Sequence, residues 1–295
     1  MVFCTQIACT LLFILGSSFS HSYSFFPFAD NSHIEYNDGN VTVMNGAALQ
    51  AKIPSIIQKN IVFDLTGVLF HPSKKFLLFE AGVWNLLWYG ITHLKNPFSI
   101  FETALLTLLY EIDGQSNEHF YKEHPLPEII CKWQRGEIAC AQILEHVQTK
   151  IAQWNEYQRF SSDREKEIVQ KIIHVAFTPD KLAHKSFKRI ESGIAVLQAC
   201  AQRRAAGEPI KIYLLSNFEK ETLEVMQQIH PDIFSLFDGM VISGNLGVMK
   251  PDQQAFEKFF AQFNLNPQKS LFIDDQKENV LAAQKAGMTA IQFLE

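Results

Sequence analysis

The chain has 295 residues, of which 47% are hydrophobic and 19% charged. This length and composition are typical of a well-packed globular protein with one large domain or a core and a smaller insert. The net charge of −5, with no run of lysine or arginine, argues against a protein that binds nucleic acid.

The first twenty residues form a segment of their own. Ile7 to Gly16 is an apolar run of signal-peptide length, and Ser18-Phe19-Ser20 follows as a small-x-small site. We therefore expect residues 1–20 to be a signal peptide or an N-terminal anchor, and the protein to be exported to the periplasm or secreted. Because residues 1–6 lack Lys and Arg, the alternative is an apolar helix packed on the domain of a cytoplasmic protein.

Residues 21–58 are polar and turn-rich at first, with a short strand predicted at 40–44, and we interpret them as an N-terminal extension. The run Ile61-Val62-Phe63 then predicts a buried strand that ends at Asp64. Gly67 follows three positions later and would let the backbone turn tightly and approach a ligand. Asp64 is thus a candidate nucleophile, and the alternative is an aspartate that only caps a turn.

After this strand, residues 71–189 are predicted to form an all-helical insert. The pattern is long and apolar, its breaks fall at turn residues such as Asn96-Pro97 and Asp113-Gly114, and no alternating strand pattern competes with it. The apolar stretch at 76–110 is typical of packing within the insert. The alternatives are a cleft for an apolar leaving group or a contact with a membrane surface.

From residue 190 the pattern changes to alternating strands and helices. Such alternation predicts an α/β fold with a Rossmann-like parallel sheet flanked by helices, built from residues 59–70 and 190–295. The expected strands are 210–215, 240–242, 271–273 and 290–293, and the expected helices are 192–206, 219–229, 252–263 and 277–286. Ligands of such sheets bind beyond the carboxyl ends of the strands.

Polar residues follow several of these strands. Ser216 and Asn217 come after one strand, Asp274 and Asp275 after another, and Lys250 precedes the helix at 252–263. Two adjacent acids directly after a buried strand are costly without a cation, and their oxygens are the ligands that Mg²⁺ prefers. The alternatives are a solvated turn for the acid pair, a surface position for Lys250 and a helix cap for Ser216.

With these residues the chain resembles the haloacid dehalogenase-like (HAD) superfamily of hydrolases. The resemblance covers about residues 59–295 and rests on four motifs in order. The motifs are Asp64-Leu65-Thr66-Gly67-Val68, Leu215-Ser216-Asn217, Met249-Lys250-Pro251-Asp252, and Phe272-Ile273-Asp274-Asp275 followed by Glu278-Asn279. The turn at 133–138 is similar to one in the helical cap of the subfamily that carries an insert after the first strand.

The resemblance implies a Mg²⁺-dependent phosphatase that hydrolyses a small phosphorylated molecule through an aspartyl-phosphate on Asp64. It implies Mg²⁺ ligation by Asp64, the backbone carbonyl of Thr66 and one acid of the Asp274–Asp275 pair, without deciding which. Lys250 would neutralise charge on the phosphoryl group. Ser216, the Asn217 N–H and Thr66 would contact the substrate phosphate.

The chain departs from the superfamily pattern at Thr66, where most of its phosphatases carry a second aspartate that serves as general acid and base. A threonine hydroxyl cannot take this role near neutral pH, and general acid–base catalysis is typically worth roughly 10²–10⁴-fold. Three readings stay open: hydrolysis of a substrate with a good leaving group or with help from another group, a slow hydrolase or phosphotransferase with a long-lived aspartyl-phosphate, and a catalytically weakened phosphate-binding or effector protein.

Overall fold

The structure, a computed structural model, describes residues 35–38, 41–73, 104–121 and 124–295. The predicted leader at 1–20 and most of the apolar stretch at 76–110 lie outside these residues. Within the described part of the chain, no helix combines the length and the hydrophobicity needed to span a membrane.

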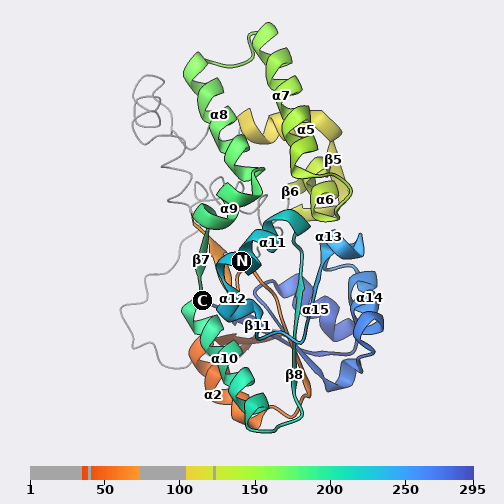
Figure 1. Ribbon diagram of the computed structural model, residues 1–295. Coiled ribbons are helices and arrows are strands. Elements are labelled where there is room, and N and C mark those ends of the chain that lie inside the picture. Colours follow the sequence, from red (N-terminus) through yellow and green to blue (C-terminus); the bar gives the residue numbers. More distant parts are fainter. Residues whose placement is uncertain (1–34, 39–40, 74–103, 122–123) are drawn as a thin grey trace.

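Among the described residues, a seven-stranded sheet forms the centre of the molecule, with the strand order β1-β2-β11-β10-β3-β8-β9 (Figure 1). Neighbouring strands are parallel except for the antiparallel pair β1–β2, which confirms the predicted Rossmann-like parallel sheet. The strands are β1 Glu35–Asp38, β2 Val41–Asn45, β3 Asn60–Phe63, β8 Lys211–Ser216, β9 Gly239–Ile242, β10 Ser270–Asp274 and β11 Thr289–Leu294. β3 lies between β10 and β8, so Phe63 stands beside both Ile273 and Leu214.

Alternation along the strands divides the sheet into two apolar faces. In β3, Ile61 and Phe63 contribute to one hydrophobic cluster and Val62 contributes to the other, because successive side chains of a strand point to opposite faces. Helices cover both faces, as Figure 1 shows for α2 and α10 on one side and α14 and α15 on the other. The helices of the core are α2 Gly46–Lys52, α10 Glu191–Ala205, α11 Lys220–Ile229, α12 Pro231–Phe234, α13 Ser243–Leu246, α14 Gln253–Phe263 and α15 Lys277–Lys285.

Part of the predicted N-terminal extension belongs to the central sheet. The strand expected at 40–44 is β2, and it pairs in parallel with β11. Helix α2, which was not predicted, follows directly, and the Asn45 side chain caps it by accepting a hydrogen bond from Ala48 N at 2.9 Å. Residues 41–52 therefore extend the core, because their apolar side chains pack against the sheet and α10.

The residues between β3 and α10 contain the insert, whose helices extend away from the sheet (Figure 1). Its described helices are α5 Leu106–Asp113, α6 Glu128–Gln134, α7 Cys140–Glu156, α8 Asp163–Ala176 and α9 Pro179–Ser186. The prediction that the insert is all-helical was wrong. β5 (Gln115–Tyr121) pairs with β6 (His124–Pro127), and β4 (Phe70–Pro72) pairs with β7 (Phe187–Arg189) where the chain enters and leaves the insert.

Candidate active site

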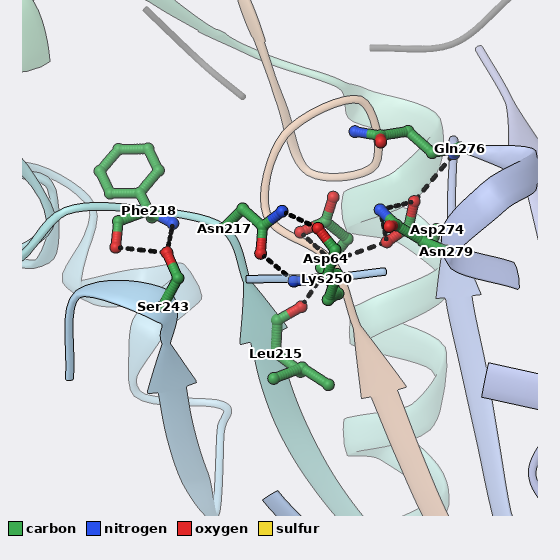
Figure 2. Close-up of polar contacts among 9 residues, drawn as sticks. All are labelled: Asp64, Leu215, Asn217, Phe218, Ser243, Lys250, Asp274, Gln276 and Asn279. Atoms are coloured by element: carbon green, nitrogen blue, oxygen red, sulfur yellow. Dashed lines mark hydrogen bonds and ion pairs between the residues drawn. The ribbon is translucent and has the colours of Figure 1, made fainter. Parts of the chain in front are cut away.

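The predicted site residues meet at the carboxyl edge of the sheet. Asp64 directly follows β3 and Asp274 ends the neighbouring β10, and the Asp64 N–H donates to the Ile273 carbonyl at 2.9 Å. Ser216 ends β8 on the other side of β3. Lys250 comes from the loop between α13 and α14 and reaches both acids, as Figure 2 shows.

The ammonium group of Lys250 is enclosed by oxygens. Its Nζ lies 2.6 Å from Asp274 Oδ2 and 3.0 Å from Asp64 Oδ1, and it donates to the Leu215 carbonyl at 2.9 Å. Burial alone would lower the pKa of Lys250, but the charges of Asp274 and Asp64 more than offset it, so the pKa is raised. The side chain is therefore a fixed positive charge beside the candidate nucleophile.

Asn217 has a structural role besides the predicted contact of its N–H with phosphate. Its Oδ1 accepts a hydrogen bond from Lys250 N, and its Nδ2 donates to the Lys250 carbonyl, both at 2.7 Å (Figure 2). These two bonds set the backbone from which the Lys250 side chain extends. Next to Asn217, the Ser216 Oγ is buried and has no hydrogen-bond partner among the described residues, so it can donate to a ligand.

Three carboxylates gather around this lysine. Single oxygens of Asp64, Asp274 and Asp275 lie within 4.8 Å of one another. Burial raises the pKa of Asp274 to about 6, although Lys250 opposes this, and it raises the pKa of Asp275 as well, with the charges of Asp274 and Asp64 adding to the effect. If all three carboxylates were ionised, one ammonium would leave two negative charges in excess. A divalent cation would balance that charge, and this set of hard oxygen donors fits Mg²⁺.

The two adjacent acids have different surroundings. Asp274 Oδ2 contacts Lys250, Asn279 Nδ2 lies 3.1 Å from each of the two Asp274 oxygens, and Gln276 N donates to Oδ1 at 2.8 Å. Asp275 Oδ1, by contrast, is buried without a hydrogen-bond partner among the residues that the structure describes. Protein donors thus occupy both oxygens of Asp274, whereas Oδ1 of Asp275 has no such donor among the described residues. In the sequence, Asn279 was identified only as part of a motif. The signal that could have found its role is its position five residues after Asp274, at the start of a predicted helix.

Gly67 explains how the Asp275 carboxylate can lie against the turn after β3. A Cβ at Gly67 would stand 2.2 Å from Asp275 Cγ, and its φ of +77° is one that residues with a side chain rarely adopt. The Gly67 N–H donates to the Phe70 carbonyl at 2.8 Å, and Thr66 forms a backbone bridge with Phe70, which closes this turn. The turn therefore places Thr66 and Gly67 beside the acid cluster.

Several known proteins are similar to this chain. The family model of haloacid dehalogenase-like hydrolases matches residues 58–287. A sesquiterpene phosphatase of Aspergillus oryzae is 29% identical over 93 residues, which are 32% of this chain and 47% of that protein. The enolase-phosphatase E1 of Aquifex aeolicus is 33% identical over 86 residues, which are 29% of this chain and 38% of that protein.

The matched segment covers less than half the length of each of these two curated relatives. A solved HAD-family enzyme from Bacteroides thetaiotaomicron shares the fold at a TM-score of 0.50 and 17% identity, covering 80% of this chain and 93% of that one. The family match spans most of the chain and includes every residue of the carboxyl-edge cluster. The chain belongs to the haloacid dehalogenase-like hydrolases.

Proposed function

We propose that the protein is a Mg²⁺-dependent phosphatase that hydrolyses a small phosphorylated molecule through an aspartyl-phosphate on Asp64. The observation that carries the proposal is the buried cluster itself: Asp64 Oδ1 lies 3.0 Å from the Lys250 ammonium and within 4.8 Å of oxygens of Asp274 and Asp275. Dehalogenation needs no metal, so a dehalogenase would have no use for the paired acids.

Asp64, Asp275 and the backbone carbonyl of Thr66 would hold Mg²⁺, while Asp274 would hold Lys250. We assign Asp275 rather than Asp274 because, of these two acids, Asp275 has a buried oxygen without a hydrogen-bond partner among the described residues, whereas both oxygens of Asp274 have one. When bound, the cation shields the charge of a phosphate monoester, which would otherwise repel the attacking carboxylate.

The protein's own residues would act in two steps. In the first, Ser216 Oγ and the Asn217 N–H donate to phosphoryl oxygens while an oxygen of Asp64 bonds to phosphorus and the bond to the leaving oxygen breaks. Lys250 balances the negative charge throughout. In the second step, water attacks the phosphorus, which releases inorganic phosphate and restores the Asp64 carboxylate.

Thr66 favours a second candidate, a slow hydrolase or phosphotransferase in which the aspartyl-phosphate persists. No acid stands at the position that usually protonates the leaving oxygen and later activates water. If the missing acid abolished turnover altogether, the protein would be a catalytically weakened phosphate-binding or effector protein. A substrate with a good leaving group, which needs little protonation, would reconcile Thr66 with efficient turnover.

We further propose that the insert acts as a cap over the site and accepts an apolar leaving group. Two observations support this substrate class: the uncharged apolar composition of residues 81–94 and the similarity to a sesquiterpene phosphatase. A panel of phosphate monoesters that differ only in the length of their alkyl or prenyl chain tests it, and equal kcat/KM across the panel would refute it.

Asp64→Asn tests the nucleophile with p-nitrophenyl phosphate and Mg²⁺, and we expect turnover to be lost. As a control, Asp113→Asn removes a surface carboxylate of the insert, paired with Lys132 at 2.9 Å, and should leave turnover unchanged. Equal rates in wild type and Asp64→Asn would refute the assignment. Acid-quenched single turnovers with labelled phosphate should trap a hydroxylamine-labile acyl phosphate in the wild type only.

Thr66→Asp separates the two candidates. If Thr66 only limits proton transfer, this change should raise the rate on alkyl phosphates and shorten the lifetime of the trapped acyl phosphate. An unchanged or lower rate would count against this explanation of Thr66.

A further inference from the structure

The hydroxyl of Ser243 links the insert to the loop that follows β8. Ser243, the first residue of α13, is buried, and its Oγ accepts a hydrogen bond from Phe218 N at 3.0 Å. The same hydroxyl donates to the Gln134 carbonyl, at the end of α6, at 2.7 Å. A hydroxyl has one hydrogen, and the other acceptor within reach, the Phe218 carbonyl, lies farther away at 3.4 Å. The short bond to Gln134 is therefore the preferred one.

The contact beside this hydroxyl involves backbone on both sides. A Cβ at Gly136, in the turn after α6, would stand 2.3 Å from the Gly244 carbonyl oxygen. Gly244 N in turn donates to the Phe218 carbonyl at 3.1 Å. Both polar backbone groups of Phe218 are thus held by Ser243 and Gly244, and the insert rests directly on that pair.

Phe218 is also the neighbour of the residues expected to bind phosphate. It directly follows Ser216 and Asn217, and Asn217 makes two hydrogen bonds to the backbone of Lys250 (Figure 2). A continuous chain of hydrogen bonds and peptide links therefore runs from Lys250, through Asn217 and Phe218, to Ser243 and the insert.

We propose that Ser243 is a positioning residue that couples docking of the insert to the phosphate-binding loop. This inference rests on the proposed function, because it assigns phosphate to the Ser216–Asn217 loop. Ser243 touches neither substrate nor metal; it acts by keeping the Phe218 peptide, and with it the Asn217 N–H, in place while the insert is seated. Loss of the hydroxyl leaves a buried N–H and a buried carbonyl unpaired, and either group can regain a partner only by moving.

The test compares Ser243→Ala with Ser270→Ala in the full chain. Ser270 is a matched control because it is also buried and its Oγ also makes two hydrogen bonds. The Oγ accepts from Asn60 Nδ2 at 3.2 Å and donates to the Asn266 carbonyl at 2.9 Å. Ser270 lies at the start of β10, at the end of the strand opposite to Asp274 and the candidate site. With Mg²⁺ present, we expect Ser243→Ala to raise the inhibition constant of inorganic phosphate about 10-fold or more, and Ser270→Ala to change it little. A change of equal size in both variants would overturn the inference.

Hydrogen exchange supplies a readout that does not depend on turnover. In the wild type, inorganic phosphate with Mg²⁺ should slow exchange both in peptide 214–222 and in peptide 128–140 of the insert. In Ser243→Ala the protection of 128–140 should be lost. A wild-type insert that gains no protection, or a variant that keeps it, would overturn the proposal even if the protein is a phosphatase. Coupled protection without any phosphatase activity would support the proposal and refute the proposed reaction.

If Ser243→Ala does not fold, Gly136→Ala tests the same contact from the insert side. Gly114→Ala is its control, because both glycines have a left-handed φ, +73° and +81°, but a Cβ at Gly114 meets nothing within 4 Å. Only Gly136→Ala should abolish the coupled protection, and equal protection in both variants would overturn the proposal.

Discussion

We predict that the buried carboxylate of Glu219 makes the free energy of unfolding fall as pH rises above about 4.5. This residue caps α11: its Oε1 accepts a hydrogen bond from Thr222 N at 2.7 Å, and the side chain is almost completely buried. Ligand atoms of Glu219, Glu221 and Cys140 of the insert all lie within 4.8 Å of one another. Burial, with a further contribution from the Glu221 charge, raises the pKa of Glu219 to about 7, although the bond from Thr222 opposes it.

The sign of the effect on stability follows from this shift. The unfolded chain releases the Glu219 proton near pH 4.5, its ordinary value, whereas the folded protein holds that proton up to about pH 7. The free energy of unfolding therefore falls as pH rises through this window, because the folded state binds the proton more tightly. The full shift corresponds to about 3 kcal/mol. The wild type should lose about this much unfolding free energy at Glu219 between pH 4.5 and pH 7, and Glu219→Gln should not, so the stability of the variant relative to wild type should rise by about 3 kcal/mol over that range.

Equilibrium urea unfolding at pH 4.5 and pH 8, with EDTA present, measures this difference. Gln can keep the cap through its Oε1, so the substitution removes the titration with little change in hydrogen bonding. Glu224→Gln on the same helix is the control; its carboxylate is exposed and lies 3.7 Å from Lys220, so it should shift stability by less than about 1 kcal/mol. If Glu219→Gln and wild type showed the same pH dependence, the buried carboxylate would not have the raised pKa assigned to it.

Two further predictions concern the acid cluster. Gly67→Ala would force the Asp275 carboxylate away from the turn, so it should weaken activation by Mg²⁺ about 10-fold or more. The control is Gly207→Ala, which has a similar cost from its left-handed φ but whose Cβ would meet nothing within 4 Å. Equal Mg²⁺ requirements of the two variants, measured by titrating activity with Mg²⁺, would contradict the role of Gly67. Lys250→Met removes the ammonium that pairs with the buried acids Asp64 and Asp274. The free energy of unfolding, measured in urea, should therefore fall by about 3–5 kcal/mol, and kcat should fall about 10²-fold or more. Lys258→Met, which removes a bond from an exposed ammonium to the Leu246 carbonyl, should change neither, and similar losses in the two variants would refute the assignment.

Much of the core could be predicted from the sequence because its signals are local. The apolar run at 61–63 indicated a buried strand. In the structure its successive side chains pack alternately on the two faces of the sheet. Each strand and helix that was predicted after residue 190 has bounds within one residue of those in the structure, whereas the short helices α12 and α13 were not predicted. The expectation that polar residues would gather at the carboxyl edge also holds, since parallel strands end on the same side.

The insert shows where local reasoning failed. The segment Gln115–Tyr121 is polar and lacks alternation, yet it forms β5 because β6 supplies hydrogen-bond partners. Pairing of this kind depends on context more than on the residues themselves. The same reason explains why residues 41–45 joined the central sheet: their partner β11 lies at the other end of the chain.

Local sequence patterns were enough to predict where the candidate residues Asp64, Ser216, Lys250 and Asp274 lie, because each follows a strand or precedes a helix whose pattern is readable. Which groups contact each of these side chains, however, is set by the tertiary structure. Asp274 and Asp275 are the same residue type at adjacent positions, but Lys250 and Asn279 contact the first and leave an oxygen of the second without a partner in the described residues. Electrostatic and hydrogen-bond partners come from distant segments, and no local pattern records which oxygen they will reach.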